Sequence, residues 1–361
     1  MRMSSAKSLF SGAAFAATFL ITGTTSAQST EVTFHKDIEP ILQSSCQSCH
    51  RDGGAGPMPL VTYDQVAPFA GLIEYKTGLR DRAGAMPPWY VEKDVGIQEY
   101  KDDPSLSDAE IEAISVWARS GTPKGDVADA PEPLVFDDSL KWRAGEPDLI
   151  VKTEPITKLA GTADWWGEIP SVPTGLTEDR YVKSVEIVEV NDINNQVGTG
   201  RETVGGRYIY HHMIWATAQM DENGERQPGF SIPWPVHEVG RNADIFDEDA
   251  GRLLKADSWV VSDSVHLHSN GSDTTGHLEI GFRFHDEDYE PKYRAAFIGL
   301  GNGVDISIAG NQSGQELHAY TVLEQHTKII TFEPHLHAPG ERMCLEAVSY
   351  THLTLPTNRE V

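Results

Sequence analysis

Two cysteines and a histidine near the start of the chain have the spacing of a covalent haem site. They lie in the segment Cys46-Gln47-Ser48-Cys49-His50. In this pattern both thiols bond to the haem vinyl groups, and the histidine that follows coordinates the iron. A structural zinc half-site, a thiol–disulfide redox motif and chance are the alternatives. A zinc site needs a second ligand pair, whereas Cys344 is the only other cysteine, and a redox motif does not need the histidine. The segment therefore favours c-type haem.

A methionine in a proline-containing loop is the predicted second axial ligand. Met86 lies in the segment Gly84–Trp89, and the two prolines that follow it restrict the backbone of this loop. A thioether opposite a histidine is the usual axial pair of electron-transfer cytochromes, because the soft sulfur favours reduced iron. Met58 is the alternative ligand, and either methionine could instead only fill space in a core. We predict Met86.

Histidines are the second group of residues that could do chemistry. All but one of the 14 histidines lie outside the haem motif, and most follow residue 210. Adjacent strand residues point to opposite faces, so His211 and His212 can share a metal only at a bulge or strand end, or through different ring nitrogens. Spacing alone favours one ligand there. His266 and His268, like His335 and His337, have the i, i+2 spacing that places two imidazoles on one strand face, as a metal clamp or as an ordinary polar face.

Taken in order, these groups resemble the copper type II, ascorbate-dependent monooxygenases. The resemblance rests on His211-His212-Met213, on His266 shortly before Ser269-Asn270-Gly271, and on Pro334-His335-Leu336-His337. This family includes peptidylglycine α-hydroxylating monooxygenase and dopamine β-monooxygenase. The chain is more similar to bacterial members with a fused cytochrome, and the resemblance extends over most of residues 135–345.

The resemblance implies a fold, cofactors and a reaction. His211, His212 and His266 match the ligands of the electron-transfer copper, and His335 and His337 match two of the three ligands of the oxygen-binding copper, the catalytic one. Two coppers are therefore expected in the full-length form, with covalent haem c as a built-in electron entry. The implied activity is hydroxylation of a C–H bond in a small-molecule or peptide substrate by dioxygen, with electrons from a periplasmic donor.

Two other functions remain open. The first is a non-catalytic c-type cytochrome and copper electron-transfer protein, and the second is a haem-tethered β-sandwich that binds no metal. The third ligand of the oxygen-binding copper is not identified. In the family it is a thioether well downstream of the His-x-His, whereas Met343 is the sole methionine after His337 and has the wrong context.

The haem motif is expected in a small helical domain. Apolar residues from Phe34 to Leu42 follow a helical period, and Ser107-Asp108-Ala109-Glu110 is a capping box that precedes another apolar period. We predict an all-α cytochrome c domain over residues 28–121. Residues 122–134 are rich in proline, alanine and acidic groups and are predicted to be a linker.

Short β-branched and aromatic runs follow the linker and predict strands. They are Tyr181–Val190, Tyr208–Ala216, Ser258–His266, His277–His285 and Lys328–Phe332. We predict an all-β, jelly-roll-like sandwich over residues 135–301 and a partial second sandwich over residues 302–347. A sandwich takes about 100 residues, and only roughly 60 remain from Asn302, so the second is expected to be incomplete. Residues 348–361 are expected to be a non-native tail.

The N-terminus and the composition bear on location and partners. Residues 1–27 combine a basic start, a largely apolar run and a small-residue cleavage site, which predicts a signal peptide and a periplasmic or secreted protein. The apolar run falls short of the ~20 residues that span a bilayer, so no stable membrane insertion is expected. A formal charge of −25, from 29 basic and 54 acidic residues, disfavours nucleic acid as a partner.

Overall fold

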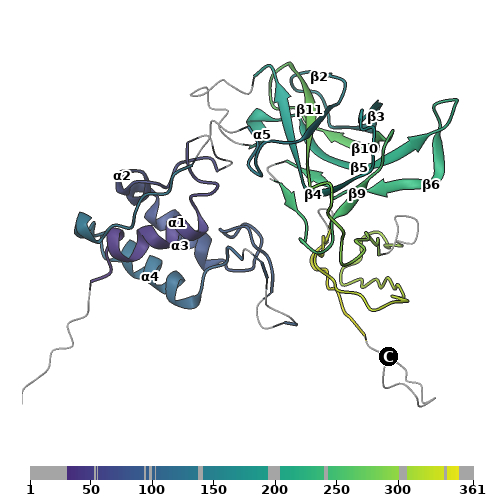
Figure 1. Cartoon of the computed structure of the whole chain (residues 1–361). Coiled ribbons are helices and arrows are strands. Elements are labelled where there is room, and N and C mark those ends of the chain that lie inside the picture. Colours follow the sequence, from purple (N-terminus) through teal and green to yellow (C-terminus); the bar gives the residue numbers. More distant parts are fainter. Residues whose placement is uncertain are drawn as a thin grey trace, which may run out of the picture. The chain divides into compact units, whose positions relative to one another are not determined.

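Two compact units make up the chain, and each is described here by itself (Figure 1). The first unit contains Met1–Ser48 and Pro59–Leu134, and the second contains Cys49–Met58 and Val135–Val361. The computed structural model describes residues 31–52, 54, 56–92, 95–96, 100–101, 103–136, 141–193, 204–239, 243–300, 307–336 and 340–348. The predicted signal peptide, residues 1–27, lies outside these ranges.

Short helices pack together in the first unit. Ser107 caps the longest of them through a capping box with Glu110, as predicted from the sequence. The buried apolar side chains that hold these helices together include Phe34, Leu42, Val66, Ile114 and Trp117. The elements are η1 (Phe34–Ile38), α1 (Glu39–Ser45), α2 (Tyr63–Val66), η2 (Ala67–Phe69), α3 (Ala70–Gly78), α4 (Asp108–Arg119) and η3 (Val127–Asp129).

The predicted all-α cytochrome c domain over residues 28–121 is not seen, and this prediction is wrong. The described chain is mostly β, its helices are few and short, and even α4 has only 12 residues. The described residues of 52–62 and 84–104 form no helix. These segments are rich in proline and glycine. Proline lacks the N–H donor of a helical hydrogen bond, and glycine loses more backbone entropy than other residues when it becomes helical, so the helices do not extend into them.

Two antiparallel sheets form the second unit. The six-stranded sheet has the order β1-β11-β4-β8, with β2 on β11 and β9 on β4, and the five-stranded sheet has the order β3-β10-β5-β6, with β7 on β5. Its elements are β1 (Leu149–Lys152), β2 (Ile156–Lys158), β3 (Trp165–Pro173), β4 (Arg180–Asn191), α5 (Val204–Arg207), β5 (Tyr210–Met220), β6 (Arg226–Pro233), β7 (His237–Glu238), β8 (Asp244–Ile245), β9 (Arg252–Leu254), β10 (Trp259–Leu267) and β11 (Thr274–Phe284).

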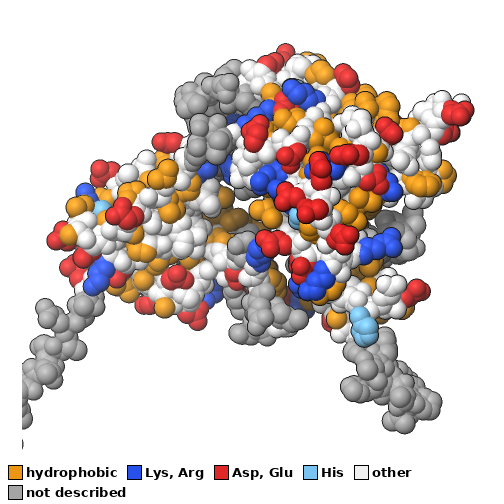
Figure 2. Space-filling view, viewed as in Figure 1, with side chains coloured by type: hydrophobic (Ala, Val, Ile, Leu, Met, Phe, Trp, Pro, Cys, Tyr) orange, Lys and Arg blue, Asp and Glu red, His pale blue; other side chains and the backbone are white. Residues whose placement is uncertain are grey.

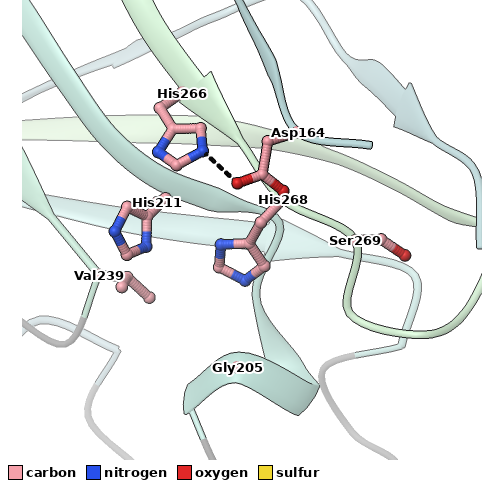
Figure 3. A pocket seen from close by; sticks show the side chains of 7 residues that line it. All are labelled: Asp164, Gly205, His211, Val239, His266, His268 and Ser269. Atoms are coloured by element: carbon pink, nitrogen blue, oxygen red, sulfur yellow. Dashed lines mark hydrogen bonds and ion pairs between the residues drawn. The ribbon is translucent and has the colours of Figure 1, made fainter. Parts of the chain in front are cut away.

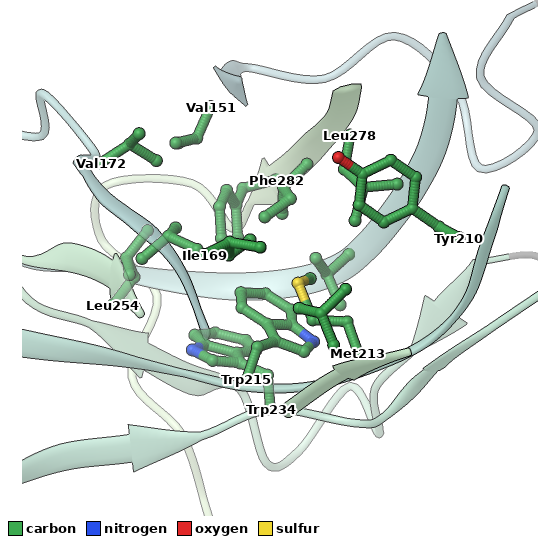
Figure 4. Packing of buried hydrophobic residues seen from close by; sticks show 14 of the residues in the cluster. Val151, Ile169, Val172, Tyr210, Met213, Trp215, Trp234, Leu254, Leu278 and Phe282 are labelled. Carbon is green, nitrogen blue, oxygen red and sulfur yellow. The ribbon is translucent and has the colours of Figure 1, made fainter. Parts of the chain in front are cut away.

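Large apolar side chains from both sheets fill the space between them (Figure 4). Trp215 of β5 stacks on Trp234 at 5.7 Å between ring centroids, and Trp234 contacts Phe282 of the other sheet edge-on at 5.4 Å. Every second position of β11 contributes to this core, through Leu278, Ile280, Phe282 and Phe284. This alternation confirms the strand that the sequence predicts here, because one face of a two-layer sandwich is buried.

The chain forms no further helix or strand in the described residues after β11. The predicted strand Lys328–Phe332 and the partial second sandwich over residues 302–347 are therefore wrong for the described ranges. Large apolar side chains in this part are exposed, for example Tyr320 at 86% and Val322 at 84%. A strand needs a neighbouring strand for its N–H and C=O groups, and no strand of the described residues pairs with this segment.

Acidic and basic side chains are interspersed over the visible surface, with no single large acidic patch (Figure 2). Among the described residues, no helix has the length and apolar content required to cross a bilayer.

Candidate metal centre

Three histidines from two paired strands of the five-stranded sheet come together at one point. His211 and His212 belong to β5, and His266 belongs to β10. One ring nitrogen from each lies within 4.8 Å of the other two. These are the three residues that the family resemblance matched to one copper, and the structure brings them together.

A β-bulge explains how two adjacent residues reach the same site. His266 pairs with His212, and the next residue of β10, Leu267, pairs with Tyr210, so His211 is the additional residue on β5. A bulge bends its strand and redirects the side chain of the inserted residue. His211 and His212 thereby escape the alternation that sends neighbouring strand residues to opposite faces.

Aromatic packing holds two of the three imidazoles. Trp166 of β3 lies beside His266 across the strands and stacks on its ring, with centroids 3.8 Å apart and planes 8° apart. The same indole contacts the His212 ring edge-on at 4.8 Å. His212 and His266 are buried, whereas His211 is partly exposed, so the site opens to solvent on the side of His211.

The hydrogen bonding of His266 fits a metal ligand. Its Nε2 lies 2.9 Å from Oδ2 of Asp164, while its Nδ1 is buried without a hydrogen-bond partner among the described residues. An unpaired buried nitrogen costs free energy unless something occupies it, and metal-bound histidines usually donate their second N–H to a carboxylate. Three imidazoles without a thiolate suit copper or zinc.

Local electrostatics favour neutral imidazoles and a bound cation. Partial burial lowers the pKa of His211, and the neighbouring His266 lowers it further. The hydrogen bond from His266 lowers the pKa of the Asp164 carboxyl, which stays ionised. A neutral imidazole offers the lone pair that a metal needs.

The pocket beside the site contains residues that sequence reasoning did not select. It is lined by Asp164, Gly205, His211, Val239, His266, His268 and Ser269 (Figure 3). The His268 ring lies 5.3 Å from the His211 ring, and burial lowers the pKa of His268. The i, i+2 spacing from His266 pointed to a shared face for His268. Asp164 and Trp166 had no recognisable signal, because they come from the loop before β3 and from β3 itself.

His335 lies next to this same cluster. Its ring centroid is 5.9 Å from that of His212, and its Nδ1 is 3.9 Å from a carboxylate oxygen of Glu238. The resemblance instead assigned His335 to a separate, oxygen-binding copper with His337. His337 lies outside the described residues, and the described residues form one cluster of three or more metal-binding side chains.

The haem motif follows α1. Cys46 is buried at the end of that helix and belongs to the first unit, whereas the exposed Cys49 and the half-buried His50 belong to the second. Nδ1 of His50 lies 3.0 Å from the Met58 carbonyl oxygen. A ring N–H donated in this way orients an imidazole and leaves Nε2 for a metal, so His50 fits an axial ligand.

The loop around His50 supports this orientation. A Cβ at Gly56 would lie 2.6 Å from Nδ1 of His50, so this close approach requires glycine. The predicted axial ligand Met86 is partly exposed, at 38%, and its backbone N–H donates to the Lys76 carbonyl. The choice between Met86 and Met58 stays a prediction.

Comparisons with protein-family models and with curated proteins found no match for this chain.

Proposed function

We propose that this chain is a periplasmic or secreted oxidoreductase that binds copper through His211, His212 and His266 and carries a covalent c-type haem. The β-bulge that brings three imidazole nitrogens within 4.8 Å of one another carries the copper part of this proposal. When bound, copper supplies one-electron transfer by cycling between two oxidation states, both of which imidazole ligands accommodate.

The surroundings of the three imidazoles favour a cation over an empty polar pocket. Asp164 contacts His266, and Glu238 of β7 lies opposite His212 of β5 in the strand register. Two carboxylates beside three imidazoles compensate the charge of a divalent ion, whereas they would repel an anionic ligand. The partly exposed His211 leaves room for ligand entry and for contact with a redox partner.

In the same proposal, the haem is the point at which electrons enter. Cys46 and Cys49 would bond to the haem vinyl groups, and His50, oriented by the Met58 carbonyl, would bind the iron. The haem then stands in place of, or beside, a diffusible reductant.

The reaction we propose is monooxygenase-like hydroxylation of a C–H bond in a small-molecule or peptide substrate. Conversion of dioxygen to one hydroxyl group and one water consumes two electrons and two protons, and the haem would deliver the electrons from a periplasmic donor. His335 and His337 are the proposed ligands of the oxygen-binding copper, in accordance with the family resemblance.

A second candidate function is electron transfer alone, between the haem and a single copper. One observation favours it, since His335 lies beside the three-histidine cluster rather than at a separate site. A carrier would take up one copper and would consume no oxygen beyond that of slow autoxidation.

Metal analysis tests the copper proposal. We expect one iron per chain and, at the three-histidine site, one copper that disappears in the His211→Ala and His266→Ala variants. His277→Ala is the matched control, because His277 lies on β11 of the other sheet and is partly buried too. Unchanged copper content in both cluster variants would contradict the proposal.

Oxygen uptake in the presence of a reductant would separate the two candidate functions, because the monooxygenase consumes oxygen and the carrier consumes none beyond slow autoxidation.

A further inference from the structure

The loop before β3 places a carboxylate against the candidate metal centre. Asp164 directly precedes β3, and its Oδ2 lies 2.9 Å from Nε2 of His266. Figure 3 shows Asp164 on one side of the His266 ring and His211 on another. The carboxylate therefore contacts the Nε2 edge of the imidazole.

This loop is anchored to the turn that follows β10. The Gly161 N–H donates to the Ser269 hydroxyl at 2.9 Å, and the Ala160 N–H donates to a carboxylate oxygen of Asp273 at 2.8 Å. Lys158 also donates to the Ala163 carbonyl. These hydrogen bonds join the loop that carries Asp164 to the turn that follows the strand of His266. The loop therefore positions the Asp164 carboxylate beside His266 without a bound ligand.

Two contacts together determine the orientation of the His266 ring. The stacked indole of Trp166 sets the plane of the imidazole, and the hydrogen bond to Asp164 sets which edge faces the loop. An ionised carboxylate can only accept, so Nε2 must carry the proton. In its neutral form the ring then has its lone pair on Nδ1, the buried nitrogen that has no partner among the described residues.

We infer that Asp164 is a positioning residue for the metal centre, which holds His266 as the Nε2–H tautomer so that Nδ1 binds the metal. This inference rests on the proposed function. It assigns the role of a supporting carboxylate to a residue that lies more than a hundred positions before its histidine, in a loop that sequence motifs do not mark.

The test uses the full chain and three variants. Asp164→Asn keeps the size of the side chain and removes its charge, and Asp164→Ala removes the hydrogen bond. Asp263→Asn is the matched control, because Asp263 is an exposed carboxylate on β10 that pairs with Arg226 instead. Urea unfolding midpoints check that each variant is folded.

Nitrogen-15 NMR of selectively labelled histidines measures the tautomer in metal-free protein. We expect wild type and Asp263→Asn to hold His266 with its proton on Nε2, and Asp164→Ala to lose this preference. Copper titration supplies the second readout. Loss of a supporting carboxylate lowers metal affinity 10–100-fold, so Asp164→Asn should raise the copper dissociation constant by about that factor and make the copper reduction potential more positive.

The two readouts separate failure of the inference from failure of the proposed function. If wild-type protein binds one copper but the Asp164 variants keep its tautomer, affinity and potential, Asp164 is not a positioning residue and the copper site stands. If wild-type protein binds no copper, the proposed function fails, and an unchanged tautomer in Asp164→Ala would overturn the inference as well.

Discussion

Glu189 is a buried carboxyl that supports the start of the strand on which two of the candidate ligands lie. Its oxygens accept the N–H groups of Ile209 and Tyr210, at 3.0 and 2.9 Å, and the side-chain amide of Asn191. Burial outweighs these hydrogen bonds and raises the pKa of Glu189 to about 7. The carboxyl therefore gains its charge near neutral pH, directly before His211.

This raised pKa predicts a pH-dependent stability. Between pH 4.5 and 7 the folded protein keeps a proton on Glu189 that the unfolded chain has released, so the free energy of unfolding falls as pH rises. The loss amounts to about 3 kcal/mol, because each unit of pKa shift corresponds to about 1.4 kcal/mol.

Urea unfolding at pH 5 and pH 8 measures this effect. Glu189→Gln keeps one of the two acceptor oxygens and does not titrate. Its free energy of unfolding should therefore rise by about 2–3 kcal/mol relative to that of wild type between the two pH values. Parallel pH curves for the two proteins would show that Glu189 does not titrate in this range.

Substitution of either cysteine of the predicted haem motif tests that motif. Cys46→Ser and Cys49→Ser should each abolish the paired thioether attachment, measured by haem staining and by the pyridine haemochrome spectrum. Cys344→Ser, at the exposed third cysteine, should stain like wild type. Two-thioether haem in either motif variant would refute c-type attachment.

At the scale of elements, β5 and β11 carry most of the organisation of the sandwich. β5 pairs with β10, β6 and β7, and its bulge against β10 creates the candidate metal centre. β11 pairs with β1, β2 and β4 and supplies alternate side chains to the core. The two sheets depend on each other, because the stacked tryptophans from one contact Phe282 of the other.

On the outer face of β11, the side chains of Pro147 and Trp142 lie close to the backbone of Gly281. A Cβ at Gly281 would lie 2.6 Å from Pro147 and 2.7 Å from the buried ring of Trp142. Gly281→Ala should lower the free energy of unfolding by about 1–3 kcal/mol, the usual cost of overpacking.

Gly299→Ala is the control for this substitution, because a Cβ at Gly299 would meet nothing within 4 Å. Urea denaturation of both variants compares them directly. A Gly281→Ala protein as stable as the control would mean that Trp142 and Pro147 move aside without cost.

At the scale of the whole molecule, all residues of the proposed copper site belong to the second unit. Its three histidines, together with Asp164 and Trp166, come from strands of the five-stranded sheet or the loop before β3. The haem residues Cys46, Cys49 and His50 are not among the three proposed copper ligands. Copper binding should therefore not depend on haem attachment.

Copper loading of the haem-free variant tests this independence. Cys46→Ser protein should bind the same number of copper ions per chain as wild type, with a dissociation constant within about twofold, since the two sets of proposed ligands share no residue. His211→Ala protein should in turn keep its haem. Loss of copper from Cys46→Ser would show that the copper site depends on haem attachment.

Local patterns in the sequence determined much of this protein. The capping box at Ser107, the alternation along β11 and the histidine-rich strands are set by neighbouring residues, so their prediction needed no tertiary information. The combination of His211, His212 and His266 was selected through the family resemblance, since spacing alone favoured one ligand at His211 and His212.

Only the tertiary structure decided which of these residues meet. The bulge at His211 depends on the register between β5 and β10, which follows from packing across the sandwich rather than from either strand alone. Asp164 reaches His266 through a loop more than a hundred residues earlier in the chain. The all-α domain and the second sandwich failed as predictions because periodic segments form regular structure only where length, backbone chemistry and a packing partner allow it.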